Sequence, residues 1–140
     1  VLRRLLRRAV RMGKKLGINK ITKEDIRPDA DYVYICIEGS GLGTNGQIYI
    51  DRDNSASTGF TTGGAGMDYM LEGSRIYAHP DNSSSWSWTE VGSSGVTVVK
   101  NSSVYEVQIS KSVISGNGST INVTFKDINL FKIGVTILDL

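Results

Sequence analysis

The residues best suited to chemistry lie in the segment IYIDRDNSASTGF, residues 48–60, where a strand-like pattern meets a group of oxygen-bearing side chains. Oxygen ligands recur there at every second position, at Asp51, Asp53 and Ser55. Carboxylates and hydroxyls at this spacing suit a hard cation such as Ca²⁺. The segment is not an EF-hand, because the glycine and the bidentate glutamate of that loop are both absent.

A second segment, GMDYMLEG, adds Asp68 and Glu72, which are four residues apart and would share one face of a strand. If that strand pairs beside the first segment, Asp68 could complete an oxygen cage, and Glu72 is a further candidate ligand. The alternative is a purely polar turn, in which Asp51, Asn54 and Thr58 bond to nearby backbone groups. The sequence leaves both interpretations open.

Few residues of the chain could serve as a catalytic nucleophile or base. His79 is the single histidine and precedes a proline in an expected loop, where we expect a solvated ring. Cys36 is the single cysteine and lies within an expected strand without basic neighbours, so we expect a small buried side chain. One histidine and one cysteine are too few for a typical zinc or copper site, and no nucleophile-elbow sequence is present. We therefore expect no enzymatic activity.

Two tryptophans offer a candidate binding surface. Trp86 and Trp88 are two positions apart in SWSWTEV, so both rings would project from the same side of a strand. They either anchor the core or form a flat platform on which sugar rings stack. The serines around them would leave the other side polar, which favours a core position for at least one ring.

Four N-x-S/T sequons mark candidate glycosylation sites, at Asn82, Asn101, Asn117 and Asn122. All but Asn122 lie in polar, loop-like stretches. Sequons at this density suggest an exported protein with a glycosylated surface.

The elements that must position these residues follow a period of two from Asp31 onward. Val, Ile, Tyr, Trp and Thr are concentrated in short runs between Gly, Ser and Asn clusters, which predicts strands. The expected strands are residues 32–38, 47–51, 67–73, 74–79, 85–91, 95–100, 103–110, 120–127 and 132–140. Without intervening helices, this pattern predicts an all-β fold, an antiparallel β-sandwich with jelly-roll-like character. The stretch GLGTNG, residues 41–46, fits a dinucleotide fingerprint, but a strand rather than a helix follows it, so we expect a hairpin.

The first 20 residues differ from the rest in charge and in period. They carry eight Lys/Arg and no acid, whereas residues 21–140 carry eight Lys/Arg against 14 Asp/Glu, a net charge of −6. Leucines at helical spacing opposite the bases predict an amphipathic helix, which could bind RNA, an anionic membrane or an acidic partner. We divide the chain into a basic helix or leader (1–20), a linker (21–30) and a β-sandwich domain (31–140).

Four segments of the body occur in an order found in a known group of modules: IYIDRDNSASTGF, GMDYMLEG, SWSWTEVG and SVYEVQISKSVI. Over about residues 31–127, the chain resembles the secreted prokaryotic β-sandwich modules related to carbohydrate-binding-module family 9 and to DOMON-like domains. The resemblance implies a jelly-roll-like fold, export, and non-catalytic binding of polysaccharide or assembly of surface structures, often with bound calcium. The matching positions are Asp51, Asp53, Thr58, Gly59, Asp68, Glu72, Trp86, Trp88 and Glu106.

The chain departs from that group at its start, where the opening strand is absent and the basic segment stands instead. VLRRLLRRAVRMGKKLGI itself resembles the arginine-rich helix of bacterial-type alanyl-tRNA synthetases, which lies in their tRNA-recognition region. The likeness covers about residues 1–18 only, and we interpret it as a fused or misassembled fragment. A missing strand would expose a sheet edge that a strand from a neighbouring subunit could fill, giving filaments.

Three hypotheses follow. The first is an extracellular, non-catalytic binding module with Ca²⁺ as structural ion and carbohydrate as ligand. The second is a subunit of an extracellular filament or surface layer, assembled from like subunits by strand complementation. The third, which we rank last, is RNA binding through the N-terminal helix. No run of about 20 apolar residues occurs, so we expect no membrane span.

Overall fold

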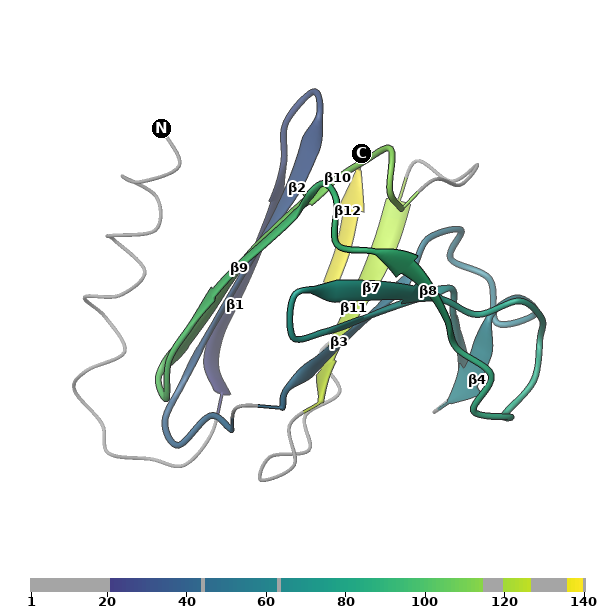
Figure 1. Ribbon diagram of the computed structural model, residues 1–140, viewed down its shortest axis with the longest axis horizontal. Helices are drawn as coiled ribbons and strands as arrows, with labels where there is room; N and C mark the ends of the chain where they lie inside the picture. The colour runs from purple at the N-terminus through teal and green to yellow at the C-terminus, as the bar shows by residue number, and fades with distance from the viewer. Residues whose placement is uncertain (1–20, 44, 63, 115–119, 127–135, 140) are drawn as a thin grey trace.

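The computed structural model describes residues 21–43, 45–62, 64–114, 120–126 and 136–139, and two antiparallel sheets face each other within it (Figure 1). One sheet has four strands in the order β1-β2-β10-β9, and the other has six in the order β12-β11-β3-β6-β7-β8. A small two-stranded sheet, β4-β5, completes the described part. The strands are β1 (Ile21–Pro28), β2 (Tyr32–Gly39), β3 (Gln47–Asp51), β4 (Phe60–Thr62), β5 (Ala65–Met67), β6 (Tyr69–Glu72), β7 (Arg75–Ala78), β8 (Thr89–Gly92), β9 (Val96–Lys100), β10 (Val104–Ser110), β11 (Thr120–Lys126) and β12 (Thr136–Asp139).

The all-β prediction is confirmed, since two antiparallel sheets with the core between them are consistent with a β-sandwich. The expected strand at 47–51 matches β3 in full, because its alternation of apolar and polar residues is bounded by clear turn residues. The predicted helix at 1–20 lies outside the described residues.

Residues 21–28 were expected to belong to a linker (21–30), and this prediction is wrong. They form β1, which pairs antiparallel with β2 along its length, from Ile21 opposite Gly39 to Pro28 opposite Val33. The segment ITKEDIRP is charged because β1 is the last strand of its sheet, and charged side chains are common on such edges. Only Ile26 of its later half enters the core, so the hydrophobic pattern that marks a half-buried strand was weak.

The core is built by alternate residues of both sheets. From the four-stranded sheet, β2 contributes Val33, Ile35 and Ile37, each at most 1% exposed. Residues of β3, β6, β7 and β11 face them from the six-stranded sheet, among them Phe125. Since successive side chains of a strand point to opposite faces, the same strands also present a second set of residues outward.

The glycine-rich stretch 41–46 is not the expected hairpin. It leads from β2 in the four-stranded sheet to β3 in the six-stranded sheet, so it crosses from one layer to the other. Gly46 is required at the crossing, because a Cβ there would lie 2.8 Å from the ring of Phe125. As expected, a strand and not a helix follows it, which leaves no helix N-terminus to hold a pyrophosphate.

Candidate functional site

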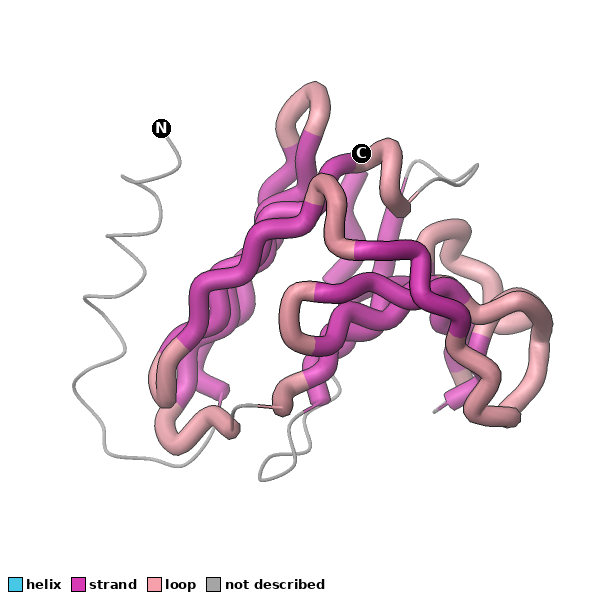
Figure 2. The backbone as a smooth tube through the Cα atoms, in the orientation of Figure 1, coloured by secondary structure: helices cyan, strands magenta, loops and turns pink. Residues whose placement is uncertain are grey.

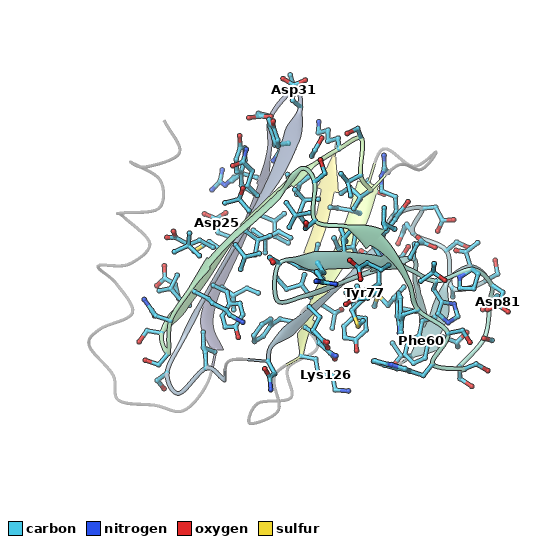
Figure 3. The ribbon with its side chains drawn as sticks, in the orientation of Figure 1. Asp25, Asp31, Phe60, Tyr77, Asp81 and Lys126 are labelled. Atoms are coloured by element: carbon cyan, nitrogen blue, oxygen red, sulfur yellow. The ribbon has the colours of Figure 1, made fainter. Side chains whose placement is uncertain are left out.

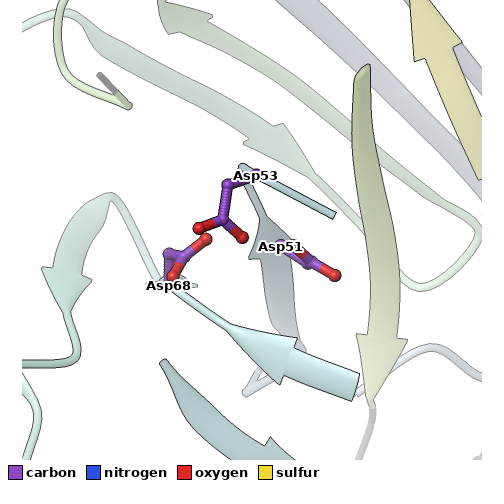
Figure 4. Close-up of side chains that lie close together, drawn as sticks. All are labelled: Asp51, Asp53 and Asp68. Carbon is purple, nitrogen blue, oxygen red and sulfur yellow. The ribbon is translucent and has the colours of Figure 1, made fainter. Parts of the chain in front are cut away.

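Three aspartates meet where β3 ends, and we call them the carboxylate cluster: Asp51, Asp53 and Asp68 (Figure 4). One ligand oxygen from each lies within 4.8 Å of those from the other two. Asp51 is the last residue of β3, Asp53 belongs to the turn that follows, and Asp68 joins β5 to β6. The backbone N–H of Asp68 donates to the carbonyl of Ile50 at 2.9 Å, which holds the two segments together.

Backbone groups fix the turn around the carboxylate cluster. The N–H of Ser55 donates to Asp51 Oδ1 at 3.2 Å and to Asp53 Oδ1 at 3.0 Å. The hydroxyl of Thr58 donates to Asp53 Oδ1 at 2.9 Å. Asn54 has a φ of 56°, a left-handed conformation that asparagine tolerates. The aspartates that hydrogen-bond the turn are thus the same ones that could bind a cation, so the two interpretations of this segment are compatible.

The electrostatics of the cluster favour a positive ligand. Burial raises the pKa of Asp68, and the charges of Asp53 and Asp51 raise it further, against the opposing N–H groups of Arg52 and Asp53. The backbone N–H of Arg52 donates to Asp68 Oδ2 at 2.7 Å. Carboxylates this close repel one another when all are ionised, and a cation between them removes that cost.

Asn122, one of the four predicted glycosylation sites, is buried against the cluster. It is 7% exposed on β11, directly opposite Asp51 in the strand register. Its Nδ2 donates to Asp51 Oδ2 at 3.2 Å and to Asn54 Oδ1 at 2.5 Å. In the folded chain the amide of Asn122 therefore supports the acidic turn and is not presented to solvent. The sequence held a signal of this burial, because Asn122 lies among the hydrophobic residues of an expected strand.

Two of the predicted cation ligands lie elsewhere or act differently. Glu72 is exposed at the far end of β6, where it accepts a hydrogen bond from the side chain of Gln47. Four residues of a strand span about 13 Å, so a shared face does not bring Glu72 to Asp68. Ser55 supports the cluster through its backbone N–H, while its hydroxyl bonds to Ser57 Oγ at 2.9 Å.

Beside the cluster lies an aromatic patch made of Phe60, His79, Trp86 and Trp88 (Figure 3, around Phe60). The tryptophans do not share a strand face as predicted, because they lie in the loop that precedes β8. Their rings meet at 74° with centroids 6.1 Å apart, so they form no flat platform. Trp86 is 60% exposed, whereas Trp88 is half-buried and packs on Tyr49 at 6.0 Å. Trp88 therefore packs against the fold, whereas Trp86 stays exposed at the surface.

His79 connects the patch to the carboxylate cluster, and the expectation of a solvated ring is wrong. Its side chain is 0% exposed. Ring nitrogens Nδ1 and Nε2 lie 2.6 Å from the carbonyl of Asp81 and 2.9 Å from that of Ser85. Its backbone N–H donates to the carbonyl of Asp68 at 2.9 Å. His79 thereby holds the loop that carries both tryptophans.

The other candidate residues are dispersed. Cys36 is buried on β2, as predicted, and Glu106 is half-buried on β10 of the same sheet. The sequon residues Asn82 and Asn101 are exposed, and Asn117 lies outside the described residues.

No known protein family, curated protein or solved structure matches this chain. The class that the structure defines is an all-β fold of two antiparallel sheets with an acidic triad that could hold a metal ion. The described residues contain no helix of the length and apolarity that crossing a bilayer requires.

Proposed function

We propose that this chain is a non-catalytic, extracellular β-sandwich module that binds Ca²⁺ at the carboxylate cluster and carbohydrate at the aromatic patch. The observation that carries the proposal is the direct connection of the two sites. The backbone of Asp68 bonds to that of His79, whose ring lies 5.0 Å from that of Trp88. An ion that orders Asp68 would therefore also order the loop that presents Trp86.

The chemistry of the cluster favours calcium over other metals. All three residues supply carboxylate oxygen, the ligand of hard cations, and neither histidine nor cysteine belongs to the group. Asp51 is 2% exposed, while Asp53 is exposed, so the site opens on one side to solvent. Ca²⁺ accepts such mixed sets of protein and water oxygens, whereas Mg²⁺ requires a near-octahedral arrangement.

The aromatic patch supports carbohydrate as the ligand. Trp86 is held edge-on against Phe60, with ring centroids 5.7 Å apart, and exposes its remaining surface. An exposed aromatic ring offers an apolar face on which a sugar ring can stack, and hydroxyl and amide groups nearby can bond to sugar hydroxyls. Thr61 and Asn82 supply such groups, and they bond to each other at 2.8 Å.

Thermal unfolding in the presence of CaCl₂ or MgCl₂ tests the cation site. We expect Ca²⁺ to raise the midpoint in the wild type and to have little effect in Asp51→Asn or Asp68→Asn. Asp31→Asn is the matched control, because Asp31 is an exposed aspartate between β1 and β2, outside the cluster and the aromatic patch. A wild-type midpoint that millimolar Ca²⁺ leaves unchanged would contradict the proposed ion.

Retention on insoluble polysaccharides and a glycan array test the ligand. Trp86→Ala should abolish binding, whereas Val91→Ala, which shortens another exposed apolar side chain, should leave it intact. Absence of any glycan bound by the wild type in saturating Ca²⁺ would refute the carbohydrate part and leave the cation part standing.

A second candidate function is assembly of like subunits along a sheet edge. The four-stranded sheet ends in β1 on one side and in β9 on the other, and each of these terminal strands is an edge that another chain could extend. Val99 on β9 is 62% exposed, which favours pairing with another chain. Val99→Lys should then dissolve any filament seen by electron microscopy, and a monodisperse wild-type monomer at high concentration would exclude this function.

A further inference from the structure

The side-chain carbonyl of Asn122 is a buried oxygen without a hydrogen-bond partner in the described part of the chain. Asn122 is 7% exposed, and its register partner across the sheet is Asp51 of the carboxylate cluster. Its amide nitrogen is satisfied, because Nδ2 donates to Asp51 Oδ2 at 3.2 Å and to Asn54 Oδ1 at 2.5 Å. A buried polar atom that is left unpaired costs stability, so a favourable interaction is still available to Oδ1.

The carboxylate cluster is buried on the side where Asn122 lies and open to solvent on the other. Asp51 is 2% exposed, whereas Asp53, in the loop between β3 and β4 (Figure 2), is exposed. Ca²⁺ takes about six to eight oxygen ligands at about 2.3–2.6 Å, and water supplies those that the protein does not. Because solvent reaches the side of Asp53 and not that of Asp51, protein oxygens must complete the shell next to Asp51.

We propose that Asn122 is a further ligand of the cation, which Oδ1 binds after a half-turn of the side-chain amide. This assignment rests on the proposed Ca²⁺ site and adds a ligand from β11 to it. A half-turn about χ2 exchanges Oδ1 and Nδ2, and this torsion of asparagine is broad and roughly two-fold. Oδ1 would then lie at the 3.2 Å that now separates Nδ2 from Asp51 Oδ2. Neighbouring oxygens around Ca²⁺ are about 3 Å apart, so this position fits a shared ion.

The charges around the amide explain why it is observed with its nitrogen toward Asp51. Without a cation, two oxygens at this distance repel each other, whereas Nδ2 donates a hydrogen bond to the carboxylate. A divalent cation reverses the preference, because it attracts the carbonyl oxygen and repels the amide hydrogens. Asn54 is an exposed loop residue, so its side chain can move aside when the amide turns.

The alternative role of Asn122 is that of a donor only, which holds Asp51 in place for the other ligands. The two roles use different atoms of one amide, Oδ1 for the ligand and Nδ2 for the donor. In the ligand role, the cation joins β11 to the turn after β3 and to the junction of β5 and β6, so it ties neighbouring strands of the six-stranded sheet together. A substitution that keeps the oxygen and removes the donor separates the two roles.

Asn122→Asp is that substitution, and calorimetric titration with Ca²⁺ measures its effect. In the ligand role, the variant should bind Ca²⁺ at least about tenfold more tightly than the wild type, because affinity follows the number of ligand charges. Its thermal midpoint without Ca²⁺ should fall, since a fourth carboxylate joins the cluster. Asn101→Asp is the matched control, because it adds the same charge at an exposed position between β9 and β10 and should leave the affinity unchanged. Weaker Ca²⁺ binding by Asn122→Asp would overturn the proposal.

Nuclear magnetic resonance of the wild type provides a readout that does not depend on the folding of a variant. On saturation with Ca²⁺, the ¹³Cγ signal of Asn122 should move downfield, as expected for a carbonyl bound to a cation, while that of Asn101 stays in place. An Asn122 ¹³Cγ signal that does not move downfield would overturn the ligand role and leave Ca²⁺ binding at the carboxylate cluster standing. A wild type that shows no heat of Ca²⁺ binding would overturn the proposed cation site itself, so the two failures are distinguishable.

Discussion

The protein has two groups of three carboxylates, and they differ in how the backbone arranges them: the carboxylate cluster, and Asp25, Glu38 and Glu106 on the four-stranded sheet. In the carboxylate cluster, a tight turn and a strand junction bring three oxygens within 4.8 Å of one another. On the face of the four-stranded sheet that points away from the core, Asp25 and Glu106 are the register partners of Cys36 on either side, so sheet geometry separates their backbones by about 10 Å. Converging carboxylates suit a single metal ion, whereas carboxylates on separate strands do not meet at one point. Backbone geometry, and not the number of acids, decides which group can hold a metal ion.

The largest effect on stability is expected from a substitution that disturbs the approach of the three aspartates without changing a charge. Gly59 has a φ of +64°, and a Cβ there would lie 2.4 Å from the carbonyl oxygen of Met67, next to Asp68. Gly59→Ala should therefore lower the free energy of unfolding by at least about 2 kcal/mol, through backbone strain and collision. Chemical denaturation measures this loss, and calorimetry should show weaker Ca²⁺ binding.

Gly64→Ala is the control for that comparison. Gly64 has a φ of +83° with nothing within 4 Å of an added Cβ, so only conformational strain applies there. A loss as large as that of Gly59→Ala would show that the collision beside Asp68 is unimportant.

Removing one charge from each group should separate their roles. Asp51→Asn should weaken Ca²⁺ binding by at least about tenfold, because affinity follows the number of ligand charges. Glu106→Gln, on β10 of the four-stranded sheet and outside the carboxylate cluster, should leave Ca²⁺ affinity unchanged. Isothermal titration calorimetry measures both affinities. Equal losses of Ca²⁺ affinity in both variants would mean that the two groups are not distinct.

The pH dependence of stability should change sign when Ca²⁺ is bound. The pKa of Asp68 is higher in the folded protein than in the unfolded chain. Without a cation, the folded state therefore loses stability as the pH rises from the ordinary pKa of an aspartate to the raised pKa of Asp68. Bound Ca²⁺ requires the ionised form, so stabilisation by Ca²⁺ should grow over the same window and be lost on acidification. Thermal midpoints measured across mildly acidic pH check this, and Asp68→Asn should remove the dependence at this site.

The smallest effect on folding is expected at the exposed ring. Trp86 is 60% exposed, so Trp86→Ala should change the free energy of unfolding by no more than about 0.5 kcal/mol. Trp88→Ala should cost more, because this half-buried ring packs on Tyr49 and His79. Urea denaturation compares the two, and equal costs would refute the division of roles between the tryptophans.

The sequence by itself determined the fold class and the heart of the site. The period of two along QIYID places Ile48 and Ile50 in the core and ends β3 at Asp51, so β3 and the acidic turn after it were predictable. Asp68 was also recognised, because a carboxylate ahead of an apolar run is a local signal. Local patterns suffice where a residue's neighbours in sequence set its environment.

Only the tertiary structure decided which distant residues meet. Asn122 faces Asp51 through strand register, and Glu72 is carried away from the cluster by the length of β6. His79 is buried because the loop after it folds back over its ring. The strand β1 forms because its backbone pairs with β2, and an edge strand can keep charged side chains. In each case the deciding contact joins segments whose pairing no local pattern specifies. Sequence periodicity fixes which way a side chain points, and the packing of sheets and loops fixes what it finds there.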